Sequence, residues 1–449
     1  MSVGLFPGQG SYRIGCLDGL LTDPDARHAI EAVDDIAAEQ LGRGLIKSLV
    51  DNAALGDDGL ADAEPELVQV AAFAASVAVF EVLRAKGATL SVLVGHSLGE
   101  IAALVAAGAL TLEEGTRILF HRFAALREHD TSGGRMVALS CDRQRAEQIL
   151  ALLPSSDAVV AVANGATQTA VSGPADALRR VARVADAIGM TATHLRAPHP
   201  FHNPLLEPAR RAFAERVRGH RSHGFRIPVF SPILGRYYRD QDDLGELLAA
   251  HLVTPVEFGA AVSRAHGSGA RVWVEVGGGR ALTNLVRARH PEVTVLTPLH
   301  GSPEALTDTV RFLGGATTAT TPAPAPVPAP VAQPAPVVAA APAVAPATPP
   351  VATQEVPRTA ISRDVIEARV RKLYADALEY PEEVFEHEAE LEADLGIDSV
   401  KQTELMARVG DVFELGPRPE GMRMGDYRTF GKVIDFVADS LPAVNGSRR

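Results

Sequence analysis

Short runs of β-branched and other apolar residues alternate with longer Ala/Leu-rich segments over roughly the first 310 residues of the chain. The predicted strands are "VGLF" (3–6), "SVLVG" (91–95), "PVFSP" (228–232), "RVWVEVG" (271–277) and "VTVLTPL" (293–299). The stretches between them carry helical periodicity, which is typical of helices that cross over between parallel strands. The pattern therefore predicts an α/β domain with a parallel sheet over residues 1–312.

A different order of elements interrupts this pattern from about residue 134 to about residue 198. It runs "MVALS", a helix from Arg143, "AVVAVAN", "QTAVSG", a helix from Ala175 and "MTATHLR". The order βαββαβ is that of the ferredoxin-like split unit. We therefore expect a small ferredoxin-like subdomain inserted into the larger domain.

The composition changes abruptly over residues 313–358 to Ala, Pro, Val and Thr. Such a segment has no amphipathic pattern with which to close a core, so we expect a linker biased toward extended polyproline II. A proline-rich ligand for another protein is the alternative, although no basic residue accompanies the prolines.

The region 359–442 is predicted to be an α-helical bundle. Residues 355–449 carry 13 Lys and Arg and 20 Asp and Glu, so this bundle is acidic and suited to basic patches on partner enzymes.

Composition narrows the class of protein. The chain has 449 residues, 46% of them hydrophobic, which is enough for two or three domains with their own cores. Its two cysteines are too few for a disulfide framework or a four-cysteine metal site, so we expect a cytoplasmic protein without a metal. The N-terminus does not resemble a signal peptide, and apolar runs such as residues 70–80 are shorter than a membrane span needs. A net charge of −12 argues against nucleic acid as a partner.

The stretch "LVGHSLGEIAAL" places Ser97 between two glycines, after a predicted strand and before a predicted helix. This is the context in which G-x-S-x-G forms a nucleophile elbow. An oxyanion on an attacked carbonyl would meet the Leu98 N–H and the positive end of the helix. A chance match in a glycine-rich and alanine-rich chain is the alternative. Glu100 is predicted to be a dipole and capping residue, with orientation of the active site as the alternative. His96 is predicted to be structural because adjacent side chains diverge.

A second candidate is Arg122, in the helical stretch "EEGTRILFHRFAALREH". It falls within the apolar stripe of that helix, whereas Arg117 and Arg127 lie off the stripe. A guanidinium on a buried face needs an anion, and its planar fork suits a carboxylate. The alternative is a structural ion pair with a carboxylate of the protein.

Five separated motifs agree with one known family. They are "FPGQGS", "GHSLGE", an arginine 25 residues beyond the serine, "FHNPLLEP" and "EVGGGRALT". In that order they resemble malonyl-CoA:acyl carrier protein transacylases and the acyltransferase domains of polyketide synthases, over roughly residues 1–300. The resemblance implies a hydrolase-like parallel-sheet core and acyl transfer through an acyl-serine.

The resemblance also implies the catalytic residues. Ser97 is expected to be the nucleophile, with the main-chain N–H groups of Gln9 and Leu98 as the oxyanion hole. His202 is expected to be the general base. The family orients this histidine with a backbone carbonyl, which maps to His251, so no acidic third member is expected.

Substrate residues follow in the same way. Arg122 is expected to bind the free carboxylate of a malonyl-type substrate, and Gln69 to line the site. Phe201 resembles malonyl-selective members, because a bulky ring crowds a branch at C2 of the substrate. The chain departs from the family at Tyr12, Val70, Phe123 and Asn203, which are not catalytic groups.

The stretch "LEADLGIDSVKQTEL" contains a second serine of interest, Ser399, after an aspartate and at a predicted helix start. By position alone it is a helix N-cap. The whole string, however, resembles the phosphopantetheine attachment site of acyl carrier proteins. We expect 4'-phosphopantetheine on Ser399, and helices over about 362–378, 399–413 and 430–440.

Together these expectations describe a didomain that moves a malonyl unit from malonyl-CoA through Ser97 to the thiol arm on Ser399. The expected partners are a phosphopantetheinyl transferase and a ketosynthase or other synthase subunits acting in trans, in polyketide, antibiotic or fatty acid type biosynthesis. The alternatives are an editing hydrolase that removes acyl groups from carriers, an inactive carrier and docking module, and a generic esterase.

Overall fold

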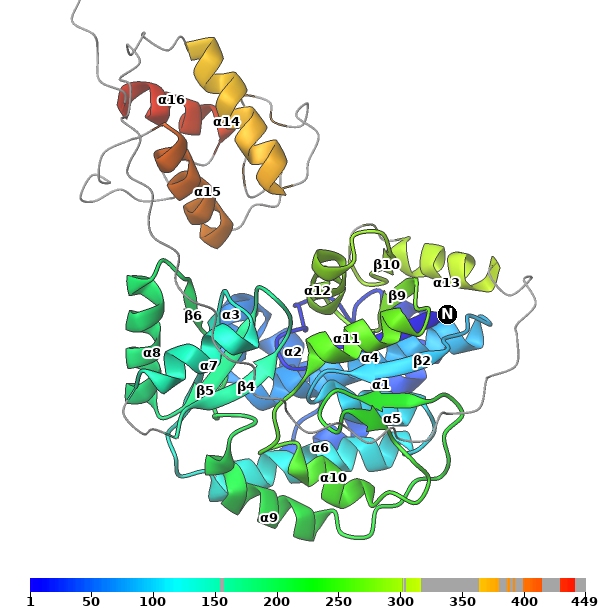
Figure 1. The fold of residues 1–449 in the computed structure, drawn as a ribbon. Helices are drawn as coiled ribbons and strands as arrows, with labels where there is room; N and C mark the ends of the chain where they lie inside the picture. Colours follow the sequence, from blue (N-terminus) through cyan, green and yellow to red (C-terminus); the bar gives the residue numbers. More distant parts are fainter. Residues whose placement is uncertain are drawn as a thin grey trace, which may run out of the picture. The chain divides into compact units, whose positions relative to one another are not determined.

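The computed structural model describes residues 1–153, 157–300, 302, 304–315, 363–378, 385, 387, 391, 399–413 and 429–440 (Figure 1). The chain forms two compact units, Met1–Pro328 and Ala329–Arg449. Most of the predicted linker, residues 316–358, lies outside the described residues, as do the residues just before Ser399.

A six-stranded sheet forms the centre of the first unit, in the order β10-β9-β1-β2-β7-β8. Its strands are β1 (Ser2–Phe6), β2 (Val92–Gly95), β7 (Val229–Ser231), β8 (Arg236–Tyr237), β9 (Val272–Glu275) and β10 (Thr294–Leu296). All neighbours are parallel except β8, which pairs antiparallel with β7. The five strands predicted from the sequence are confirmed, and β1 and β2 end side by side where Phe6 pairs with Gly95.

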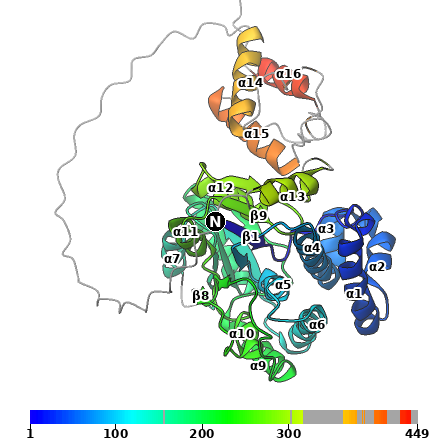
Figure 2. The ribbon, with the colours of Figure 1, turned by 90° about the vertical axis from the view of Figure 1, so that its right-hand side faces the viewer.

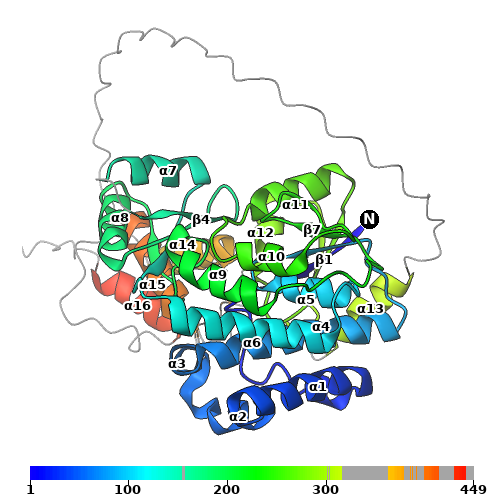
Figure 3. The same cartoon turned by 90° about the horizontal axis from the view of Figure 1, so that it is seen from below.

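Helices cover both faces of this sheet, and Figures 2 and 3 show α4 next to it with α1 and α2 outside α4. The helices of this layer and its surroundings are α1 (Pro24–Leu41), α2 (Leu45–Asp51), α3 (Gly56–Ala63), α4 (Pro65–Ala85), α5 (Gly99–Ala106), α6 (Leu112–His129), α9 (Glu207–Arg216), α10 (Leu244–Ala250), α11 (Phe258–Gly267), α12 (Ala281–Arg289) and α13 (Ala305–Gly315). Short 3-10 helices lie at Leu20–Thr22, Ala53–Leu55 and Pro204–Leu206.

Helix α4 is apolar on all sides because it is enclosed by α1, α5 and α6. Every residue from Leu67 to Phe80 is buried. Among the described residues it is the one helix long and apolar enough to cross a membrane, and 89% of its apolar window is buried inside the protein. Its composition is therefore that of a core helix.

The inserted subdomain contains a four-stranded sheet in the order β4-β5-β3-β6, with antiparallel neighbours. Its elements are β3 (Arg135–Leu139), α7 (Arg143–Ala151), β4 (Val159–Ala163), β5 (Thr169–Gly173), α8 (Ala175–Ala187) and β6 (Ala192–His194). This is the ferredoxin-like arrangement that the sequence predicts, and its helices and sheet share a separate apolar core.

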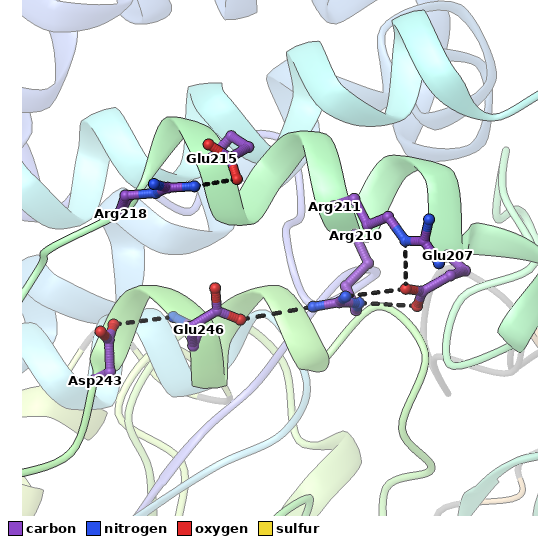
Figure 4. A network of polar contacts seen from close by, with 7 residues as sticks. All are labelled: Glu207, Arg210, Arg211, Glu215, Arg218, Asp243 and Glu246. Atoms are coloured by element: carbon purple, nitrogen blue, oxygen red, sulfur yellow. Dashed lines mark hydrogen bonds and ion pairs between the residues drawn. The ribbon is translucent and has the colours of Figure 1, made fainter.

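Helices α9 and α10 are joined by a network of exposed ion pairs (Figure 4). Arg210 binds Glu207 on its own helix and lies 3.6 Å from Glu246 on α10. Exposed pairs of this kind contribute little to stability, about 0–1 kcal/mol each. The packing of α10 therefore depends mainly on its buried residues, Leu244, Leu248 and Ala249.

The second unit has three described helices, α14 (Arg363–Leu378), α15 (Ser399–Val412) and α16 (Phe430–Ser440). All three confirm the helices predicted from the sequence to within a residue. Their buried faces meet around an aromatic cluster of Tyr374, Phe385 and Phe430. Ser399 is the first residue of α15.

Candidate active site

The turn between β2 and α5 has the form of a nucleophile elbow. Ser97 lies in the turn with a backbone φ of 54°. A Cβ on Gly95 would lie 2.3 Å from the Cα of Glu100, and one on Gly99 would lie 2.1 Å from the carbonyl oxygen of Phe6. Only glycine fits at either position, because real Cβ atoms do not approach backbone so closely. The two glycines let the helix pack against the ends of β1 and β2, which sets the direction in which Ser97 points.

His202 lies opposite, in the segment that follows β6. The Oγ of Ser97 is 2.8 Å from the Nε2 of His202. Ser97 and His202, whose φ is 61°, are the two non-glycine residues with positive φ in the described part of the chain. Strained backbone of this kind persists where the surrounding structure enforces it, and it is concentrated at functional sites. The strain therefore marks these two residues independently of the motifs.

The hydrogen bond made by Nδ1 of His202 determines that Nε2 acts as the acceptor toward Ser97. Nδ1 is 2.9 Å from the carbonyl oxygen of Thr254 and donates its hydrogen to it. Nε2 is then left to accept from the Ser97 hydroxyl. Burial, together with the nearby charge of Arg122, lowers the pKa of His202 to about 3, so the ring is neutral at pH 7.

The main-chain groups that orient His202 differ in part from the prediction. We expected the carbonyl of His251; the hydrogen bond of 2.9 Å is made by Thr254, three residues later, and the backbone of His251 makes a weaker interaction with the same imidazole. The chain turns after α10 and ends its helical bonding at Thr254, whose N–H still bonds Ala250. Pro255 follows and cannot continue the helix, so the Thr254 carbonyl is left free to face His202. The side chain of His251 is buried and does not line the cavity.

The loop after β1 supplies the other wall of the elbow. A Cβ on Gly8 would lie 2.5 Å from the carbonyl oxygen of His96, so this loop packs directly against the turn. Within the described residues, neither the N–H of Gln9 nor that of Leu98 donates to a protein acceptor. Two free amides beside Ser97 are suited to an oxyanion.

Arg122 projects from α6 into the same cavity and is only 6% exposed. Its Nη1 donates to the Oε1 of Gln69 at 2.9 Å, and its guanidinium lies 4.7 Å from the ring centre of Phe201. No carboxylate lies within 4.0 Å of it in the described part of the chain. Burial lowers its pKa to about 10, so it remains charged at pH 7. The site thus contains a buried cation without an ion-pair partner, and Gln69 holds it in place.

The cavity has a volume of about 240 Å³ and lies between the two sheets. Its lining comes from the elbow, the loop after β1, α6, the subdomain strands and the segment before His202: Gln9, Gly10, His96, Ser97, Leu98, Arg122, Met136, Val162, Asn164, Ala170, Leu195, Arg196, Ala197, Phe201 and His202. A nucleophile with its base, two free amides and a buried cation therefore share one space. This set can carry out acyl transfer on a substrate that bears an anionic group.

Residues 3–297 match the family of acyl transferase domains. The chain belongs to the acyl transferase family. Residues 368–437 match the family of phosphopantetheine attachment sites, which includes the whole of α15. The resemblance predicted from the motifs, the acyltransferase activity and the carrier domain are therefore confirmed.

The relatives of this acyltransferase include free-standing enzymes and parts of large synthases. A malonyl CoA-acyl carrier protein transacylase of Bacillus subtilis is 28% identical over 289 residues, which cover 63% of this chain and 88% of that protein. A non-reducing polyketide synthase of Aspergillus flavus is 30% identical over 286 residues, but this chain spans only 14% of its length. A polyketide synthase of Streptomyces halstedii is 31% identical over 284 residues, 63% of this chain and 4% of that protein.

Solved structures place the fold in the same group. The malonyl CoA-acyl carrier protein transacylase of Coxiella burnetii matches with a TM-score of 0.63 and 26% identity, covering 70% of this chain and 98% of that one. The acyltransferase domain of an iterative polyketide synthase of enediyne biosynthesis matches with a TM-score of 0.53 and 28% identity, covering 70% and 71%. The expected α/β architecture is thereby confirmed.

Several residues around the site were not found from the sequence. The Oδ1 of Asn164 accepts from the Nε2–H of His96 at 2.9 Å, and Asn203 donates to the carbonyls of Ser172 and Asp157 in the subdomain. Asn203 thereby ties the His202 segment to the subdomain sheet. Its only signal in the sequence is that it follows the histidine where the family has a small residue.

One group of potential metal ligands, His266, His290 and Glu292, lies outside the cavity. Within the described residues it is the one such group. The two imidazole rings are stacked 3.7 Å apart at 12°, and His266 is 2.8 Å from Glu292. Because the lone pairs of stacked rings run in parallel planes, they do not converge on one ion. The group is better described as a hydrogen-bonded His266–Glu292 pair with a stacked second ring.

Proposed function

We propose that this acyltransferase moves a malonyl unit, or a closely related dicarboxylic acyl group, from coenzyme A to a carrier arm on Ser399. One observation carries the choice of substrate: the buried guanidinium of Arg122 lacks an ion-pair partner and shares a cavity with Ser97. A buried charge is costly unless it is paired. A carboxylate at the far end of the acyl group would pair with it in a bidentate manner.

The first half-reaction acylates the serine. His202 takes the hydroxyl proton through Nε2 while Ser97 Oγ attacks the thioester carbonyl, and the amides of Gln9 and Leu98 receive the oxyanion. The tetrahedral intermediate collapses with cleavage of the C–S bond, and the leaving thiolate takes the proton back from His202. The carbonyl of Thr254 accepts the Nδ1 hydrogen throughout, which stabilises the imidazolium while it exists.

The second half-reaction uses the same groups in reverse order. Ser399 begins α15, and the positive end of a helix suits an attached phosphodiester. When attached there, phosphopantetheine supplies the thiol that accepts the acyl group. His202 serves as base for that thiol and returns the proton to Ser97, while Arg122 keeps its hold on the carboxylate.

The setting of the reaction is part of the proposal. The carrier arm requires a phosphopantetheinyl transferase, and the loaded unit requires a ketosynthase or another synthase subunit to consume it. The relatives among polyketide synthases support polyketide or fatty acid type biosynthesis. An editing hydrolase is less consistent with this site, because a carboxylate-binding arginine has no use in general acyl removal.

Phe201, whose ring lies over Arg122, supports malonyl over C2-branched units.

Replacement of Arg122 tests the substrate. Arg122→Ala should lower kcat/KM for malonyl transfer roughly 100-fold while acetyl transfer changes by less than about threefold, because only the malonyl carboxylate loses its partner. The matched control is Arg127→Ala, on the same helix, whose arginine is exposed and pairs with Glu66. Equal losses for the two acyl groups would show that Arg122 has a structural role.

The pH dependence of Ser97 acylation tests the state of the base. With the pKa of His202 at about 3, the neutral ring persists in acid, so the single-turnover rate should stay within about twofold between pH 7.5 and pH 5.5. The rate is measured by intact-protein mass after rapid mixing with malonyl-CoA, and circular dichroism checks the fold at each pH. A fall centred near pH 6.5 would contradict an unprotonated buried base.

The covalent link between the two domains predicts loading within one chain. The phosphopantetheinylated protein should acquire malonyl on Ser399 with a rate constant that does not change on tenfold dilution, because tethering gives a local concentration on the order of millimolar. Mixing a Ser97→Ala chain with a Ser399→Ala chain gives the matched rate between chains. A rate that scales with protein concentration would show that loading occurs only between molecules.

A further inference from the structure

Glu100 is fully buried, three residues after Ser97 in the first turn of α5. The sequence suggested a dipole and capping residue, but its side chain turns inward. Its Oε1 accepts from the hydroxyl of Ser231 at 3.0 Å, and its Oε2 accepts from the hydroxyl of Tyr238 at 2.7 Å. A carboxyl buried to this extent requires such partners. The two donors come from the end of β7 and from just after β8.

The same tyrosine reaches the end of α10. The hydroxyl oxygen of Tyr238 lies 3.1 Å from the Nε2 of His251, which is itself 3.4 Å from Glu100. Because the tyrosine hydrogen is directed to Glu100, the Nε2–H of His251 donates to the tyrosine oxygen. Burial raises the pKa of Glu100 to about 8 and lowers that of His251 to about 3, so the imidazole of His251 is neutral at pH 7.

His251 begins the turn that holds the base. The turn ends at Thr254, whose carbonyl accepts from His202 at 2.9 Å. Between them, the carbonyl of Leu252 accepts from the main-chain N–H of Asn203 at 3.2 Å. The turn therefore binds two consecutive residues of the strained segment. His251, the first residue of the turn, is itself held by its buried hydrogen bond to Tyr238.

We propose that Glu100, Tyr238 and His251 are positioning residues, which fix the Thr254 carbonyl and through it the ring of His202. Glu100 lies on the helix that begins beside Ser97, and hydrogen bonds connect it through Tyr238 to His251. The turn from His251 to Thr254 then connects to His202, which contacts Ser97. None of the three touches the cavity. This proposal rests on the proposed function, because it assigns the three side chains to the orientation of its base.

The test uses the full-length chain without the carrier arm, so that any acyl group stays on Ser97. Single-turnover acylation by malonyl-CoA is followed by intact-protein mass and peptide mapping. Tyr238→Phe should slow acylation about 10- to 100-fold with the apparent affinity for malonyl-CoA unchanged within about twofold, as for a group that acts only on the reaction step. The matched control, Tyr237→Phe, alters the adjacent and partly exposed tyrosine and should have no effect.

Two further comparisons separate positioning from a structural role. Glu100→Gln keeps one acceptor oxygen and replaces the other oxygen by an N–H donor to which a hydroxyl oxygen can accept, so it should retain activity within about threefold, whereas Glu100→Ala removes both partners and should behave like Tyr238→Phe. In a His202→Ala background, Tyr238→Phe should cause no further loss, because the residue through which it acts is gone.

The outcomes are distinguishable. The same loss from Tyr238→Phe in both backgrounds, or wild-type rates in Tyr238→Phe and Glu100→Ala, would overturn the positioning proposal and leave the proposed function standing. Failure of the wild-type chain to acylate at Ser97 would overturn the proposed function and this proposal with it. Should Tyr238→Phe fail to fold, the Glu100→Gln and Glu100→Ala pair gives the same decision.

Discussion

The hydrogen bond between Ser97 and His202 joins two residues whose backbones both lie in the left-handed region. Each such residue costs roughly 1–3 kcal/mol, so the surrounding structure must hold both in place. On one side, Gly99 packs against the carbonyl of Phe6 and closes the elbow against the sheet. On the other, Asn203 is held by carbonyls of the subdomain and of the turn after α10. The six-stranded sheet and the subdomain sheet therefore both hold the two residues that make the Ser97–His202 hydrogen bond.

The same arrangement explains why a cation is tolerated in the cavity. The six-stranded sheet supplies the serine, α6 supplies Arg122, and the subdomain strands supply the apolar lining, including Met136 and Val162. A guanidinium in such surroundings is stable only with strong partners, and in the described residues it has the neutral amide of Gln69. An incoming carboxylate would complete the site, which links substrate choice to the electrostatics of the cavity.

The sequence predicted those features that depend on local pattern. Strand and helix positions follow from periodicity, and Ser97 follows from the elements around it. Ser399 follows from the resemblance of its sequence motif, since its position alone suggests a helix N-cap. The sequence pointed to the backbone of His251 and did not identify the Thr254 carbonyl, which makes the stronger hydrogen bond, because a main-chain oxygen carries no side-chain signal and its direction depends on where a turn ends. Glu100 was interpreted mainly as a helix cap for a similar reason. Its position three residues after the nucleophile suggests a helix cap, and only the tertiary approach of Tyr238 and Ser231 turns it into a buried group.

Acyl transfer at this site depends most directly on one hydroxyl, that of Ser97, and one base, His202. Peptide-level mass spectrometry of the full-length chain, after brief exposure to malonyl-CoA, measures both the position and the rate of acylation. We predict a malonyl adduct that is confined to Ser97 and whose formation slows about 10²- to 10⁴-fold in His202→Ala. An adduct on another residue, or an undiminished rate without the imidazole, would contradict this prediction.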